Sequence, residues 1–216
     1  MSKIMFYTGG CCEPKSAIAV NKFDDVSKAQ YLTTGDLGVT AFKEIMFLES
    51  SSDIDWRVRR YFDLDLDDID TDLIGYFVLD SVSDFSYRLI DRENAYGDAE
   101  YFTKRVAVNI DDFISKIRAA DAQLIILSDD VGCSVRPTDK NERLAQEVIG
   151  NLNRYIAGKA DEVYVVWFFE DEENFRKGSV HTCLGAGKSF MVRKKLDRTI
   201  EEYAADYDAR NMGTEG

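Results

Sequence analysis

Residues 123–166 read QLIILSDDVGCSVRPTDKNERLAQEVIGNLNRYIAGKADEVYVV. They begin with an apolar run at residues 123–128, whose length and polar flanks are typical of a strand buried on both faces. Residues 141–158 then repeat apolar side chains at the spacing of one helical face, and residues 162–169 form a second apolar run. A strand, a helix and a strand in this order predict a βαβ unit and a parallel sheet.

The rest of the chain continues this alternation. Further strand-like runs occupy residues 3–8, 29–33 and 76–80, and helix-like segments occupy residues 16–23 and 110–119. The expected fold is therefore a doubly wound, three-layer α/β domain with a mostly parallel sheet. In such sheets ligands bind beyond the carboxyl ends of the strands, which here end near Gly9, Thr34, Asp80 and Ser128.

The charge and composition of the chain limit its partners. Its 216 residues carry a net charge of −13, and the densest basic cluster is only Arg57, Arg59 and Arg60. A surface this acidic repels phosphate backbones, so no nucleic-acid partner is expected. No apolar run approaches the roughly 18 residues of a membrane span, and residues 1–9 do not read as a signal peptide. With four cysteines and one histidine, no Cys/His zinc site is expected, and a reducing cytoplasm is the simplest location.

Residues 9–16, which follow the first predicted strand, read Gly-Gly-Cys-Cys-Glu-Pro-Lys-Ser. A phosphate loop (P-loop) reads G-x-x-x-x-G-K-[S/T] between a strand and a helix, and Gly9, Lys15 and Ser16 fall in its register. The second glycine is replaced by Pro14, which has no N–H to offer a phosphate, and Glu13 adds a negative charge. The stretch predicts either a degenerate phosphate loop or an ordinary strand–turn–helix connection that binds no nucleotide.

Several acidic residues follow predicted strands. Asp80 is a candidate magnesium ligand, with the cap of a helix or turn as the alternative. Asp129 and Asp130 are expected to be a solvated pair of turn acids, with a role beside a metal or as a base as the alternative. The aspartate-rich run 63–72 lacks the glycine and glutamate of a calcium loop and is expected to be solvated. Residues 182–189 (TCLGAGKS) lack the first glycine of a phosphate loop and are not expected to bind phosphate.

The 123–166 block resembles the C-terminal half of the adenosylcobinamide kinase/adenosylcobinamide-phosphate guanylyltransferase family. The pattern of that family is an apolar strand, S/T-N-E-V-G, a loop with a proline, a helix with G-x-L-N-Q-x-x-A, and A-D-E-V before the last strand. The matching residues are Ser128, Val131, Gly132, Pro137, Gly150, Leu152, Asn153, Ala157, Ala160, Asp161, Glu162 and Val163. Asp129 and Asp130 stand where the family has Asn and Glu.

Earlier segments resemble the family in the same order. Gly9, Gly10, Lys15 and Ser16 match its G-G-x-x-S-G-K-S loop. Residues 32–35 resemble the A-T-[GS] end of its second strand, and residues 80–83 resemble its D-C-L-T segment. The resemblance implies a phosphate-loop NTPase-like domain at residues 1–169. Residues 170–216 are then a C-terminal extension packed on the same domain, with a final amphipathic helix near residues 200–207.

The resemblance also implies a reaction. The family phosphorylates the hydroxyl of adenosylcobinamide with a nucleoside triphosphate and then transfers GMP from GTP through a guanylylated histidine. That histidine lies in an arginine-containing helix after the second strand, and the corresponding residues 53–61 hold arginines but no histidine. Because a phosphoramidate needs an imidazole nitrogen and arginine stays protonated, the guanylyltransferase step is expected to be lost. The single histidine, His181, lies in the extension and is expected to be a surface or satisfied loop residue.

Two functional hypotheses follow from the resemblance. In the first, the chain is a cobinamide kinase of cobalamin biosynthesis that binds GTP or ATP with Mg²⁺. Its catalytic residues would be Lys15 and Asp80, its metal ligands Ser16 and Asp80, and its nucleotide-binding residues Gly9, Gly10, Lys15, Ser16, Thr34 and Gly35. In the second, the chain is a non-catalytic descendant that binds a nucleotide, a corrinoid or a protein partner. A nucleotide and a corrinoid-like small molecule are the expected partners, and assembly into a homo-oligomer stays open.

Overall fold

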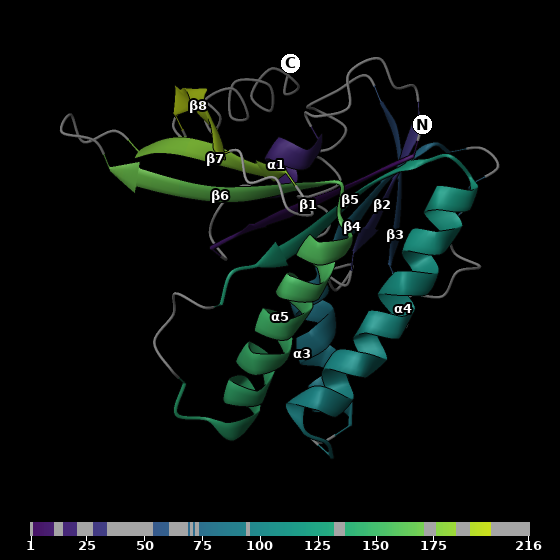
Figure 1. Cartoon of the computed structure of the whole chain (residues 1–216), viewed down its shortest axis with the longest axis vertical. Coiled ribbons are helices and arrows are strands. Elements are labelled where there is room, and N and C mark those ends of the chain that lie inside the picture. Colours follow the sequence, from purple (N-terminus) through teal and green to yellow (C-terminus); the bar gives the residue numbers. More distant parts are fainter. Residues whose placement is uncertain are drawn as a thin grey trace, which may run out of the picture.

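The fold was analysed in a computed structural model of the whole chain (Figure 1). The described residues are 2–10, 15–20, 28–33, 54–60, 69, 71, 74–93, 96–131, 137–170, 176–184 and 191–199. Within them, one sheet runs through the molecule and helices lie on both of its faces (Figure 1). This arrangement confirms the predicted doubly wound α/β class with a mostly parallel sheet.

The sheet orders its strands β3-β2-β4-β5-β1-β6-β7-β8. From β3 to β6 every neighbouring pair is parallel, whereas β6, β7 and β8 pair antiparallel. The described strands are β1 (Lys3–Gly9), β2 (Lys28–Thr33), β3 (Asp55–Arg60), β4 (Tyr76–Asp80), β5 (Gln123–Asp129), β6 (Glu162–Glu170), β7 (Arg176–Leu184) and β8 (Met191–Thr199).

Within the described residues, three long helices cover one face of the sheet, and a short helix lies on the other (Figure 1). The long helices are α3 (Val82–Arg92), α4 (Ala99–Ala119) and α5 (Lys140–Lys159), and the short one is α1 (Lys15–Val20). Ser81, Asp98 and Asp139 are the N-caps of the long helices, and their side chains accept hydrogen bonds from backbone N–H groups of the first turn. Each cap satisfies donors that would otherwise have no partner, which fixes where the helix begins.

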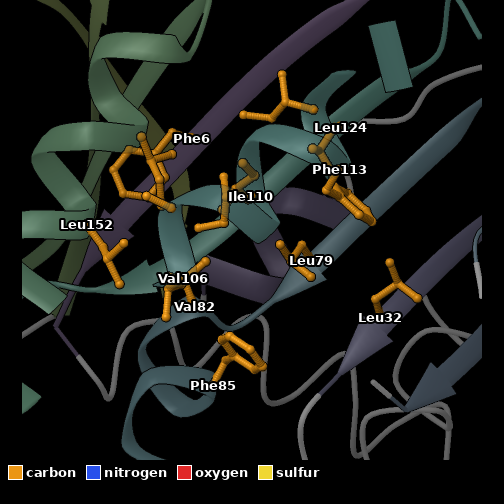
Figure 2. Close-up of a cluster of buried hydrophobic side chains, with 14 of the residues drawn as sticks. Phe6, Leu32, Leu79, Val82, Phe85, Val106, Ile110, Phe113, Leu124 and Leu152 are labelled. Carbon is orange, nitrogen blue, oxygen red and sulfur yellow. The ribbon is translucent and has the colours of Figure 1, made fainter. Parts of the chain in front are cut away.

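The middle of each central strand is largely apolar because both of its faces are buried. In β5, Leu124 and Ile126 belong to the core under the long helices, and Ile125 and Leu127 belong to the core on the opposite face. Successive side chains of a strand point to opposite faces, so a continuous apolar run fills both cores at once. Figure 2 shows the first core, where side chains of the strands meet those of α4, among them the fully buried Ile110.

The strand ends come level because the parallel pairs are in register. Gly9 of β1 lies opposite Asp129 of β5, and Asp80 of β4 lies opposite Thr33 of β2. These residues are the last of their strands. Residues separated by more than a hundred positions in the sequence therefore meet at one edge, as expected for ligand sites in parallel sheets.

Two regions differ from the sequence-based expectation. Residues 55–60, which correspond to the arginine-containing helix of the family, form the edge strand β3. Trp56 and Val58 alternate with arginines there and pack on the core opposite the long helices. This alternation has the period of a strand rather than that of a helix. The helix expected at residues 110–119 is longer, since α4 begins at Ala99 behind its Asp98 cap.

The strands that follow residue 170 join the same sheet. β7 pairs with β6 along its whole length, and β8 pairs with β7. The phosphate-loop-like stretch 182–189 begins inside β7 and leads to a strand, β8, rather than to a helix. The amphipathic helix expected near residues 200–207 lies outside the described residues. Across the described helices, none is long and apolar enough to cross a membrane.

The packing of α4 gives a direct test of the first core. Replacing Ile110, which is fully buried, by alanine should lower the free energy of unfolding by about 2–5 kcal/mol, because it leaves a cavity that the neighbours fill only in part. Val108→Ala on the same helix is the matched control, since that side chain is 58% exposed. Urea unfolding should show a change of less than about 0.5 kcal/mol for the control, and equal losses in both variants would contradict this packing.

The cap of α5 gives a prediction on pH. Backbone N–H groups of Glu142 and Asn141 donate to Asp139 and hold the pKa of its carboxyl below the ordinary value. A carboxyl whose pKa is lowered in the folded state stabilises the protein above its unfolded pKa and loses that effect as the pH falls through its folded pKa. The difference in unfolding free energy between wild type and Asp139→Asn should therefore be constant above about pH 5 and shrink below about pH 4. A difference that did not vary between pH 7 and pH 3 would sink this assignment.

Candidate functional site

The candidate site lies where β1, β4 and β5 end and α1 begins. β1 ends at Gly9, which lies directly beside the end of β5, and the N–H of Asp130 donates to the Gly9 carbonyl at 2.6 Å. Lys15 is the first residue of α1. The predicted loop residues 11–14, which include Glu13 and Pro14, lie outside the described residues.

Lys15 is buried, with 5% of its surface exposed, and its ammonium is surrounded by oxygen atoms. Its Nζ donates to the carbonyls of Gly9, at 3.3 Å, and Gly10, and to Oδ1 of Asp129 at 2.8 Å. An ammonium has three hydrogens, and burying it without partners would cost several kcal/mol. All three hydrogens can therefore be satisfied by the ends of β1 and β5.

Asp80, the last residue of β4, receives two hydroxyl groups on the same oxygen. Ser16 Oγ donates to its Oδ2 at 3.2 Å, and the hydroxyl of Tyr31 donates to that atom as well. Burial raises the pKa of the Asp80 carboxyl, and the hydrogen bonds from Tyr31 and Ser16 oppose this effect. A carboxylate that faces the hydroxyl directly after a phosphate-loop lysine is the pair that holds Mg²⁺ in phosphate-loop enzymes.

The residues at Ser16 and Asp80 fit a magnesium ion that is completed by other ligands. In the described part of the chain, no three His, Cys, Asp or Glu side chains converge as a metal-binding group. Mg²⁺ is usually held by one or two protein oxygens together with water and phosphate oxygens. Ser16 and Asp80 supply that small number of oxygens, so the fit is to a metal that arrives with a nucleotide.

The start of α3 supports the end of β5. Ser83 Oγ donates to Oδ2 of Asp129 at 2.9 Å, and the Asp129 N–H lies 3.3 Å from the same hydroxyl. Ser83 also shares a hydrogen bond of 3.0 Å with Ser81, the N-cap of α3. The pKa of the exposed Asp84 carboxyl is raised, first by partial desolvation and then by the negative charge of Asp129.

The geometry brings most of the predicted site residues together. Gly9, Gly10, Lys15, Ser16 and Asp80 form one connected set of contacts. The predicted nucleotide-binding residues Thr34 and Gly35 lie outside the described residues, as does most of the acidic run 63–72.

The expectation for Asp129 was wrong. It is not a solvated turn acid, because the buried ammonium of Lys15 needs a counterion and Asp129 supplies it. Asp130 is exposed, as a turn acid would be.

Sequence reasoning missed two residues of the site. Tyr31 lies inside a strand, and no local motif shows that its hydroxyl reaches Asp80 on the neighbouring strand. Ser83 had a signal, since it ends the segment at residues 80–83 that resembles D-C-L-T of the family. That signal did not reveal its partner, Asp129, which lies 46 positions further along the chain.

The strand order, the lysine at the start of α1 and the acid at the end of β4 define an α/β domain of the phosphate-loop NTPase type. A KaiC-like protein from the hyperthermophilic archaeon Pyrococcus horikoshii OT3 is similar in structure, with a TM-score of 0.52 and 12% sequence identity. The similarity covers 90% of this chain and 85% of that protein, and at this identity it shows the fold alone.

The sequence matches the profile of the cobinamide kinase / cobinamide phosphate guanyltransferase family over residues 5–168. The chain therefore belongs to this family, whose role is in cobalamin biosynthesis. No curated protein matches the sequence. The matched range contains every residue of the candidate site and ends within β6.

The raised pKa of Asp80 predicts that its buried negative charge lowers the stability of the folded protein. Asp80→Asn removes the charge that burial disfavours, and its amide oxygen can still accept from Tyr31 and Ser16. At pH 7 the variant should unfold about 2–4 °C above wild type, the shift that 1 kcal/mol gives in a domain of this size. Calorimetric unfolding of both proteins without nucleotide measures this, and a lower midpoint in the variant would show that the carboxylate stabilises the fold.

Proposed function

We propose that the chain is a nucleotide-dependent phosphotransferase that phosphorylates the hydroxyl of an adenosylcobinamide-like corrinoid, using GTP or ATP with Mg²⁺. The observation that carries the proposal is the pair of contacts at the strand ends. Lys15 is held buried at the end of β1, and Ser16 directly after it faces the carboxylate of Asp80. Family membership supplies the corrinoid as the substrate class.

Each residue has a defined part in this reaction. Lys15 would neutralise negative charge on the β- and γ-phosphates as the phosphoryl group transfers. Ser16 and Asp80 would hold the magnesium ion, which when bound would supply positive charge against the phosphates. Gly9 and Gly10, together with the predicted Thr34 and Gly35, would line the nucleotide. Phosphoryl transfer depends mainly on positioning and electrostatic stabilisation, and residues of these types can supply both.

We infer that the second reaction of the family, guanylyl transfer through a histidine, is lost. Residues 53–61 contain no histidine, and 55–60 form the edge strand β3. The single histidine of the chain, His181, lies in β7, which is separated from β1 by β6. The chain therefore lacks, in this region, the histidine nucleophile that the mechanism of the family needs to form the nucleotidyl intermediate.

The remaining properties belong to the same proposal. Residues 170–216 form an extension of the NTPase-like domain of residues 1–169, which the pairing of β7 with β6 supports. We place the protein in the cytoplasm, where nucleotides and corrinoid intermediates are available to a biosynthetic kinase. No nucleic-acid partner is proposed, because the net charge is −13.

A second function is favoured by one specific observation in the sequence. Pro14 and Glu13 stand in the phosphate loop, where proline offers no N–H and glutamate adds negative charge. A non-catalytic descendant would keep the fold to bind a nucleotide, a corrinoid or a protein partner. The two functions differ in whether Lys15 is needed for nucleotide binding and for phosphorylation of cobinamide.

Titration calorimetry with Mg·GTP and Mg·ATP tests the proposal. Wild type should bind at least one of them in the micromolar range, and Lys15→Ala should weaken binding about tenfold or more, because a buried charge that faces the phosphates is lost. Lys104→Ala is the matched control, since Lys104 is an exposed lysine of α4 that forms an ion pair with Glu100. A cobinamide phosphorylation assay then follows the kinase directly. No heat with either nucleotide, together with retained corrinoid binding, would favour the non-catalytic descendant.

A further inference from the structure

Asp129 is held from three directions at the end of β5. Its Oδ1 accepts from Lys15 at 2.8 Å, its Oδ2 accepts from Ser83 at 2.9 Å, and its carbonyl accepts from Asn153 Nδ2 of α5 at 2.8 Å. Ser83 and Asn153 belong to two different helices that cover the same face of the sheet. These hydrogen bonds thus hold the carboxylate of Asp129 in position, independently of its attraction to Lys15.

The charges around Lys15 are unbalanced. Burial raises the pKa of the Asp80 and Asp84 carboxyls, and the charge of Lys15 opposes that rise in both, in addition to its direct contact with Asp129. Of these three carboxyl groups, only Asp129 contacts the ammonium; the other two feel it at longer range, and Asp84 also feels Arg88. A phosphate that approaches this point meets a cation whose charge is already matched, and a carboxylate at hydrogen-bond distance from it.

The contact also occupies the hydrogens that a phosphate would need. The ammonium donates to Gly9, Gly10 and Asp129, which uses the three hydrogens it has. A phosphate oxygen can bind only if one of these acceptors is given up. Asp129 is the one acceptor of the three that carries a full charge, so giving it up has the largest electrostatic consequence.

We propose that Asp129 is a positioning residue that holds Lys15 in a closed ion pair and thereby sets how weakly this loop binds the phosphates of a nucleotide. The proposal rests on the proposed function, since it concerns the same phosphate site. It assigns a reduced affinity to Asp129 at the end of β5 as well as to Pro14 in the loop.

Asparagine at position 129 is a close test because it keeps the shape of the side chain. The amide oxygen can still accept from Lys15, and the amide N–H₂ can donate to Ser83, whose hydroxyl can also act as an acceptor. The carbonyl that receives Asn153 is unchanged by the substitution. What is removed is one negative charge beside the ammonium.

The experiment compares the affinities of wild type, Asp129→Asn and Asp112→Asn for Mg·GTP, Mg·ATP and inorganic tripolyphosphate without metal. Asp129→Asn should bind all three about tenfold more tightly, the order expected when one charge close to a partly buried ion is removed. Asp112→Asn removes the same charge from an exposed position of α4 and should change the affinity less than about twofold. Tripolyphosphate reports on the phosphate site without base, ribose or metal, so a purely structural effect on other parts of the site would not move it in this direction.

Two further variants keep the outcome decisive. Asp129→Ser also removes the charge and takes over the test if Asp129→Asn does not fold, as judged by circular dichroism and thermal unfolding. Asp129→Asn combined with Lys15→Ala should lose the gain, because the effect acts through Lys15.

The possible results separate this proposal from the proposed function. Equal or weaker binding by both neutral variants at position 129 would overturn the role of Asp129. The phosphate site would still stand in that case if wild-type binding depends on Lys15. Binding by the neutral variants but not by wild type would support the role of Asp129 and would contradict the micromolar wild-type binding that the proposed kinase requires. No binding by any variant would overturn both.

Discussion

Much of this molecule depends on one buried ammonium group. Lys15 is almost fully buried, so its charge has to be balanced and its three hydrogens accepted within the protein. The acceptors come from the ends of β1 and β5, which lie side by side only because the two strands are parallel and in register. The sheet therefore does more than form a core: its register creates the place where a charged side chain can be buried.

The same register explains why the site is polar although the strands are not. Along β5 the side chains from Leu124 to Leu127 are apolar on both faces; Ser128 follows, and the next residue, Asp129, already lies at the edge where Gly9 ends β1. β4 changes in the same way from Leu79 to Asp80. Two apolar cores and one polar edge thus follow from where each apolar run stops, and hydroxyl groups from β2 and α3 satisfy the carboxylates placed there.

The sequence predicted the fold well where the pattern was local. Apolar runs identified β1, β2, β4, β5 and β6, and the phosphate-loop register placed Lys15 and Ser16 beside Asp80. β3 was missed because its arginines mask the alternation of Trp56 and Val58. The ion pair of Asp129 with Lys15 was also missed, since it joins residues 114 positions apart and depends on how far a side chain reaches beyond a strand. Such pairings need the three-dimensional register, which no motif contains.

Family membership and the missing histidine are compatible because the two reactions of the family make different demands. Phosphoryl transfer needs charges held in position, and the strand ends of this fold hold Lys15, Ser16 and Asp80 together. Guanylyl transfer through a covalent intermediate needs one particular nucleophile, and a fold cannot substitute for an absent imidazole. Losing that side chain can remove one reaction while the sheet and the phosphate site remain. In the proposed function, the reaction that persists is the one that depends on electrostatic positioning, and in this chain a carboxylate, Asp129, lies directly against Lys15 at that point.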